Sequence, residues 1–248
     1  MKSKNINIIL KIALISLILY SASIGCAGSL PEVEVQHISK YKTFQNQNGV
    51  SIAIDPFFEE KRLNKFFGTD VLSGDDILPV HIIIENNMDQ PILILRENIL
   101  LLNANKEIIQ KPSTNPAEPV EKRRRAMVKT SYLASGEVIG AVGGVGGVGV
   151  GLVGVLGGSL AMRYANIEMN IKTKSFYEKT INNKGELHHG FVYFILKDLP
   201  ILDNNAKIQV TAKNINSEAI TTFVFDVKMA DIIEEIKLRK EEESKNKP

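Results

Sequence analysis

The sequence of 248 residues contains a single cysteine, no tryptophan and only four histidines. One cysteine cannot form an internal disulfide bond, so the fold has to hold without this crosslink. The chain also has little net charge, because its 30 basic residues are balanced by 28 acidic ones. Nucleic-acid-binding proteins need clustered positive charge, and this balance gives no general electrostatic reason for such binding. A disulfide-rich scaffold and a nucleic-acid-binding protein are therefore both disfavoured.

Patterns for catalysis and metal binding are missing from the sequence as well. The histidines are His37, His81, His188 and His189. Neighbouring residues on a strand face opposite sides, so the adjacent pair cannot bind one metal ion, and no cysteine or carboxylate spacing completes a ligand set. Residues 149–154 match the letters of the dinucleotide-binding fingerprint, but Lys174 stands where that motif needs an acidic residue. No Gly-x-Ser-x-Gly nucleophile motif occurs. We expect a non-enzymatic protein without metal or cofactor.

Residues 1–25 have the pattern of a secretory leader. Lys2 and Lys4 form a basic start, an apolar core follows at about residues 12–19, and small residues come directly before Cys26. The tetrapeptide SIGC at residues 23–26 resembles the lipobox of bacterial lipoproteins, although serine stands where that family usually has leucine. The resemblance implies cleavage before Cys26 and lipidation of this residue. Ordinary cleavage near Ala27, without lipid, is the alternative.

Lipidation of Cys26 implies a location in the cell envelope. Each buried methylene group contributes about 0.8 kcal/mol, so several acyl chains on one residue hold a protein at a bilayer more firmly than one chain does. Alanine, not aspartate, follows the cysteine, and by resemblance to proteobacterial lipoproteins this implies the outer membrane, with the protein facing the periplasm. Loss of the leader removes three lysines and no acid, which leaves 27 basic and 28 acidic residues.

Strand patterns lie on both sides of residues 111–173. Residues 26–48 are mostly polar, and we expect them to form a tether between the anchor and the fold. Over residues 49–110, alternating apolar segments are separated by turn residues, which predicts strands. A short helix is predicted from Pro56 to Gly68, with its phenylalanines facing the core.

Residues 174–229 contain the second group of predicted strands. The segment at residues 187–196 is apolar at odd and even positions alike, which predicts a central strand covered on both faces. Residues 206–212 and 221–227 alternate in the manner of half-buried strands. Residues 230–248 predict a short helix that ends in a charged tail.

The two groups of strands together resemble a known domain family. The segments LPVHIIIENNMDQPILIL at residues 78–95 and GELHHGFVYF at residues 185–194 carry this resemblance. They are similar to the telokin-like, immunoglobulin-like β-sandwich domains of exported bacterial lipoproteins, which implies a non-enzymatic domain. Because each half supplies too few strands for two packed sheets, we expect both halves to form one sandwich.

The interruption between the two halves has an unusual composition. Residues 138–162 contain no charge, and ten glycines lie between residues 140 and 158. Each glycine costs a water-exposed helix about 1 kcal/mol relative to alanine, so a helix here needs close packing to offset that cost. Glycines four residues apart allow packed helices to bring their backbones into contact. The candidate helix-packing residues are Gly136, Gly140, Gly144, Gly147, Gly151, Gly154 and Gly158.

A helical hairpin is the structure that we expect for this interruption. One crossing of a bilayer would separate the two halves of the sandwich, whereas arms at about residues 120–142 and 148–172 keep both ends on one side. The alternative is a flexible linker, although valine accompanies the glycine where serine would be typical. Before the first arm's glycines lie Arg123, Arg124 and Arg125, which either face solvent or contact anionic lipid head groups. The expected fold is thus mainly β, an immunoglobulin-like β-sandwich interrupted by a glycine-rich helical hairpin.

Two functions from different classes are compatible with these patterns. The first is a lipid-anchored, non-enzymatic envelope protein whose hairpin packs against a membrane, against copies of itself or against another envelope protein. The second is a periplasmic carrier or chaperone that binds an apolar ligand or peptide between sandwich and hairpin. The sequence names neither the partner nor the ligand.

Overall fold

The computed structural model describes residues 30–69, 71–141, 148–196 and 205–230, together with residues 232–234, 238 and 241. At residues 130–141 and 148–159 only the backbone is described. The chain divides into two compact units, Met1–Pro31 and Glu32–Pro248. All the helices and strands below belong to the second unit.

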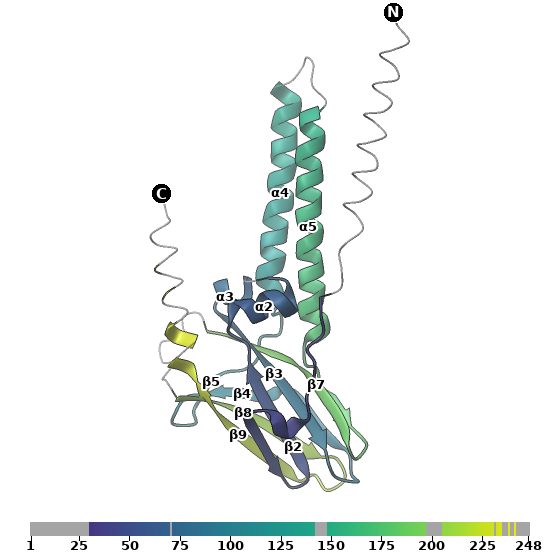
Figure 1. Ribbon diagram of the computed structural model, residues 1–248, viewed down its shortest axis with the longest axis vertical. Coiled ribbons are helices and arrows are strands. Elements are labelled where there is room, and N and C mark those ends of the chain that lie inside the picture. The colour runs from purple at the N-terminus through teal and green to yellow at the C-terminus, as the bar shows by residue number, and fades with distance from the viewer. Residues whose placement is uncertain are drawn as a thin grey trace, which may run out of the picture. The chain divides into compact units, whose positions relative to one another are not determined.

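The protein is mainly β and contains two antiparallel sheets (Figure 1). The first sheet has the order β1 (Thr43–Gln47), β2 (Val50–Pro56), β3 (Ile77–Asn86), β7 (Glu186–Ile195). The second has the order β5 (Ile108–Gln110), β4 (Ile92–Leu102), β8 (Asn205–Asn214), β9 (Ile220–Lys228), and β6 (Lys179–Ile181) pairs with β4. Each sheet therefore combines strands from before and after residues 111–173.

One hydrophobic cluster fills the space between the two sheets. Its fully buried members include Ile52 and Ile82 from the first sheet and Ile94, Val210 and Phe223 from the second. Along β8 these inward residues alternate with partly exposed ones, as the sequence pattern predicted. We refer to the two sheets and this shared core as the two-sheet body.

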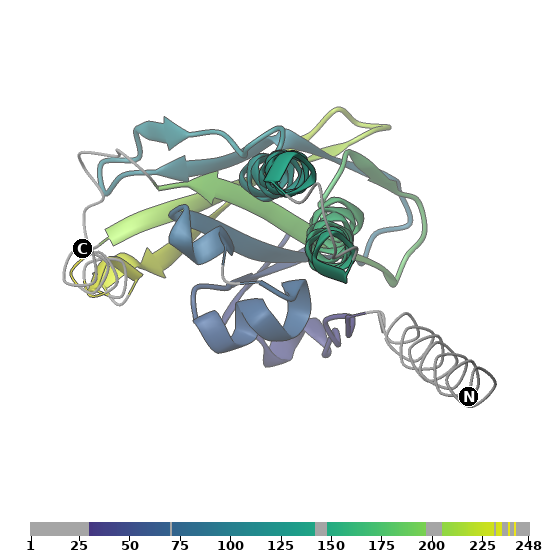
Figure 2. The ribbon, with the colours of Figure 1, turned by 90° about the horizontal axis from the view of Figure 1, so that it is seen from above.

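Helices accompany the sheets in the part of the chain that the structure describes. Among them are α2 (Glu60–Phe67), α3 (Val71–Gly74), α4 (Glu118–Ala141) and α5 (Val148–Lys174), and a short 3-10 helix, η1, covers Ile38–Lys40. The helices α4 and α5 occupy the two segments predicted as hairpin arms, and they lie side by side. Figure 2 looks along both helices and shows them next to each other above the two-sheet body.

A second hydrophobic cluster covers the outer face of the first sheet. It joins Phe57 and Phe67 with Val120 of α4, Ile171 of α5 and Phe191 of β7. We had predicted that β7 is a central strand, and this is wrong, because β7 lies at the edge of its sheet. Its two apolar faces have another cause: one contacts the core of the two-sheet body and the other contacts the helices.

The fold begins earlier in the chain than the polar composition of residues 26–48 suggested. Strand β1 already pairs with β2, and Val35 and Tyr41 pack against Ile38, Ala53 and Ile83 on the first sheet. Most residues of β1 are polar, so its sequence lacks the alternation of apolar and polar residues that predicts a strand. Residues 43–47 therefore belong to the fold and not to the tether that was predicted for residues 26–48.

The helix α2 begins later than predicted and ends where predicted. Pro56 is the last residue of β2, and α2 starts at Glu60. Gly68 terminates α2 in the left-handed conformation, with φ of 72°, and its N–H donates to the carbonyl of Asn64. This conformation favours glycine, which explains why this end of the helix was predictable.

The base of the α4–α5 hairpin is attached to the edge of β7. The N–H of Ser113 donates to the carbonyl of Tyr193, and the N–H of Phe176 donates to the carbonyl of Phe191, both at 2.7 Å. The hydroxyl of Tyr193 donates to the carbonyl of Ile171 at 3.2 Å. The segments that enter and leave the hairpin thus bind the same strand edge.

Candidate functional site

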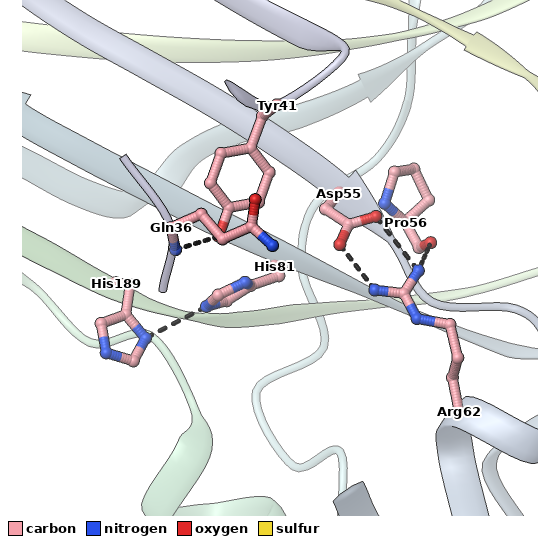
Figure 3. Close-up of polar contacts among 7 residues, drawn as sticks. All are labelled: Gln36, Tyr41, Asp55, Pro56, Arg62, His81 and His189. Carbon is pink, nitrogen blue, oxygen red and sulfur yellow. Dashed lines mark hydrogen bonds and ion pairs between the residues drawn. The ribbon is translucent and has the colours of Figure 1, made fainter. Parts of the chain in front are cut away.

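A cluster of polar side chains lies on the outer face of the first sheet, on strands β2, β3 and β7 (Figure 3). In the strand register, Asp55 is opposite His81, and His81 is opposite Phe191. Two pairs further along, Ile83 is opposite His189. Because residues two apart on a strand share a face, His81 and His189 are diagonal neighbours on that face.

His81 is the most deeply buried polar residue of this cluster, with no exposed surface. Its ring stacks on Phe191 with a centroid distance of 4.7 Å and meets the edge of Phe57 at 6.2 Å. Its Nε2 lies 3.0 Å from Nδ1 of His189, which is exposed to solvent. Nδ1 of His81 is buried without a hydrogen-bond partner among the residues that the structure describes.

The surroundings of His81 oppose a positive charge on its ring. Burial, together with the nearby His189 and Arg62, lowers the pKa of His81 to about 3. Burial also lowers the pKa of His189, while Glu32 acts in the opposite direction. Both rings are therefore neutral at neutral pH, and one N–H between them forms the hydrogen bond.

An ion pair lies next to the histidines and fixes α2 to the sheet. Arg62 of α2 donates to both carboxylate oxygens of Asp55, at 3.2 and 2.6 Å. Its guanidinium also lies over the ring of Phe57, 3.6 Å from the centroid. Such a bidentate and stacked arrangement is specific to arginine. Tyr41 lies nearby, and its hydroxyl accepts a hydrogen bond from the N–H of Gln36 (Figure 3).

The two remaining histidines lie apart from this cluster. His188 contacts Phe176 with a centroid distance of 5.3 Å, whereas its neighbour His189 contacts His81. The two adjacent histidines thus have different surroundings, because neighbouring residues on a strand point to opposite faces. His37 precedes η1 and bonds to Ser39. Within the described ranges, no group of three or more histidine, cysteine, aspartate and glutamate residues is arranged to hold a metal ion.

The three arginines at the start of α4 all have acidic neighbours. Arg123 pairs with Asp75 at 3.4 Å, Arg124 pairs with Glu168 of α5 at 3.2 Å, and Arg125 pairs with Glu121. The first two pairs connect α4 to the segment after α3 and to α5. Contact with lipid head groups stays a prediction, and it would have to compete with these ion pairs.

The glycines predicted for helix packing lie partly within the described helices. Gly136 and Gly140 belong to α4, and Gly151, Gly154 and Gly158 belong to α5. Gly144, Gly147 and the predicted lipidation residue Cys26 lie outside the described residues. Among the helices of the described ranges, none has the length and apolar character needed to cross a membrane.

Sequence comparisons identify no relatives of the chain. No protein-family model and no curated protein matches it. The crystal structure of a Bordetella pertussis protein described as ApaA aligns with 75% of this chain and 91% of its own, with 8% identity and a TM-score of 0.28. A similarity of this size supports no conclusion about fold or function.

Proposed function

We propose that the protein is a lipid-anchored, non-enzymatic component of the cell envelope. In this proposal the two-sheet body is an immunoglobulin-like β-sandwich that resembles those of bacterial lipoproteins. The α4–α5 hairpin is an insertion through which the protein associates with a second copy of itself. The anchor is the lipidated Cys26, and the protein faces the periplasm from the outer membrane.

The order of the strands supports an immunoglobulin-like topology. If β2, β3, β4, β7, β8 and β9 correspond to strands A, B, C, E, F and G, the first sheet contains A-B-E and the second contains C-F-G. The immunoglobulin fold distributes these strands between its sheets in the same way. The hairpin then lies in the connection between strands C and E, where strand D occurs in that fold.

Exposed methionines on α5 are the observation that carries the proposed association. Ile167 and Ile171 are buried against the first sheet and fix the base of α5. Met162 and Met169 are 66% and 59% exposed. They are seven residues apart and so lie on one side of α5, and this spacing is the one by which helices pair with other helices.

The sequence of α5 continues the seven-residue spacing away from the base. Val155 and Val148 precede Met162 at intervals of seven, and Gly151 and Gly158 occur at intermediate positions. Apolar residues at seven-residue intervals favour helix pairing, and glycines between them allow two backbones to come close. A second copy of α5 offers the same surface, so a symmetric contact would cover both.

The carrier hypothesis has less support from the arrangement of side chains. An apolar ligand between the sheet and the base of the hairpin would need space there. That region contains Phe57, Phe67, Phe191 and Tyr193, all almost completely buried and in contact with one another. The chain's own aromatic residues thus occupy the place that a ligand would take.

Crosslinking of the full-length protein in native membranes tests the proposed association. The variant carrying both Met162→Gln and Met169→Gln should lose the crosslinked dimer, because polar side chains replace the two exposed methionines on one side of α5. The matched control is Ile108→Gln, which changes a similarly exposed apolar residue on β5. Dimer that persists in the double variant, or disappears equally in the control, would contradict the proposal.

Fractionation of the same cells tests the lipid anchor separately. Cys26→Ala should move the protein from the membrane fraction to the soluble fraction, since the thiol that carries the lipid is gone. The variant with both methionines replaced should stay in the membrane fraction. If a variant that combines Cys26→Ala with both methionine changes still remains in the membrane fraction, the anchor is elsewhere.

A further inference from the structure

We propose that His81 and His189 form a binding site for a divalent transition-metal ion of the Cu²⁺ or Ni²⁺ type. His81 would coordinate through Nε2 and His189 through Nδ1, and water would complete the coordination. Neither the sequence patterns nor the proposed envelope function assigns such a site. The inference rests on the geometry of the two rings and is independent of the hairpin and of the lipid anchor.

The separation of the two nitrogens fits one particular coordination geometry. Imidazole nitrogens bind such ions at about 2.0–2.1 Å, so two of them at a right angle around one ion are separated by about 2.9 Å. A tetrahedral ion would separate them by about 3.4 Å. The observed distance between Nε2 of His81 and Nδ1 of His189 is 3.0 Å. It matches adjacent corners of a square-planar or octahedral site, the geometries of Cu²⁺ and Ni²⁺.

The buried ligand of the pair is held in place before any ion binds. His81 is fixed by its stacking on Phe191 and by its edge contact with Phe57. The paired strands β3 and β7 set the distance between the two backbones. The packed ring of His81 therefore loses little conformational entropy on binding, which favours affinity.

Access and local charge also permit an ion to bind. His189 is exposed, so an ion can approach it from solvent. The positive charge of Arg62 is paired with Asp55, and the charge of Glu32 acts attractively on His189. Each ring is neutral and carries one proton. When the ion is bound, each ring carries its proton on the nitrogen that does not bind the ion, which is Nδ1 of His81 and Nε2 of His189. The hydrogen bond between the rings is then lost, but neither ring has to release its proton to solvent.

Titration of the untagged full-length protein with Cu²⁺ tests the site. Calorimetry measures the affinity, and electron paramagnetic resonance measures the coupling to nitrogen. All samples carry Cys26→Ser, so that a free thiol cannot bind or reduce the ion. The reference protein should bind one ion and show hyperfine coupling to two nitrogens. His189→Ala should weaken binding at least tenfold and abolish the two-nitrogen pattern. Because His189 is exposed, this variant should keep the circular dichroism spectrum of the reference.

The matched control is His188→Ala, the adjacent residue on the same strand, which should leave affinity and spectrum unchanged. His81→Gln tests the buried ligand, and a loss of binding counts only if its thermal melt remains cooperative. Equal affinity in the reference protein and His189→Ala would overturn the proposal. Loss of binding in His188→Ala, coupling to a single nitrogen, or binding that does not saturate at one equivalent would overturn it as well.

Discussion

At the scale of single residues, His81 makes the stability of the protein dependent on pH. The unfolded chain takes up a proton at this histidine below a pKa of 6.5, whereas the folded protein does not until about pH 3. The contribution of neutral His81 is therefore fully present above pH 6.5 and is lost as pH falls towards 3. Between these values each pH unit costs about 1.4 kcal/mol of unfolding free energy.

We predict that the free energy of unfolding falls more steeply with acidification in the wild type than in His81→Gln. From pH 7.5 to pH 5 most carboxylates stay ionised, so the difference in slope reports on histidine. The difference in unfolding free energy between the two proteins should decrease by about 2 kcal/mol from pH 7.5 to pH 5, as measured by urea denaturation. Parallel curves for the two proteins would contradict the assignment.

The same residues mark the limit of prediction from sequence. The alternation of Ile82 and Ile84 with their neighbours predicted strand β3, because it depends only on nearby residues. The pairing of His81 with His189 depends on which strands are adjacent and in which register, and 108 positions separate the two residues. No local spacing contains that information, so the cluster could not be found before the fold was known.

At the scale of elements, the hairpin is attached through close contact between two backbones. Gly190 of β7 lies against the chain that leaves α5: a Cβ atom added at this glycine would lie 2.9 Å from Cα of Phe176 and 3.1 Å from its nitrogen. Backbone atoms cannot move away as a flexible side chain can. The hydrogen bond from Phe176 to the carbonyl of Phe191 depends on this approach.

We therefore predict that Gly190→Ala destabilises the protein by about 1–3 kcal/mol, the usual cost of overpacking. The matched control is Gly74→Ala at the end of α3, where an added Cβ would meet only the side chain of Arg123 at 3.6 Å. This control should stay within about 0.5 kcal/mol of the wild type. Urea denaturation of both variants gives the comparison. Equal stability of the two variants would show that the backbone after α5 moves away from the added Cβ atom without a loss of stability, which would contradict the prediction.

Helix ends and strand edges differ in how far the sequence predicts them. The end of α2 at Gly68 was predictable, because one glycine provides the required conformation. The edge position of β7 was not, because an apolar face covered by helices has the same composition as one covered by another sheet. The polar strand β1 was missed for the related reason that edge strands need little apolar surface.

At the scale of the whole molecule, each half of the chain completes the sheets of the other. Strand β7 of the second half pairs with β3 along its whole length, from Ile77–Ile195 to Asn86–Glu186. Strand β8 of the second half pairs with β4. The core between the sheets likewise contains residues from both halves, among them Ile82, Ile94 and Phe223. Separation of the halves would expose this core, remove β3 from β7 and leave β8 paired with β9 alone.

The last prediction concerns the fragment of residues 27–110. It retains β1 to β5 but lacks β7, β8 and β9, so buried residues such as Ile82 and Ile94 lose the side chains that cover them. Burial of an isoleucine side chain contributes about 1.5–3 kcal/mol, and a domain has only about 5–15 kcal/mol of net stability. Loss of a few such contacts is enough to unfold it. We expect the fragment to show no cooperative thermal transition in circular dichroism, under conditions where the full chain melts sharply.

Addition of a second fragment, residues 111–229, should restore the transition, because it supplies the missing strands. A sharp melt of the first fragment alone would mean that the two halves fold independently.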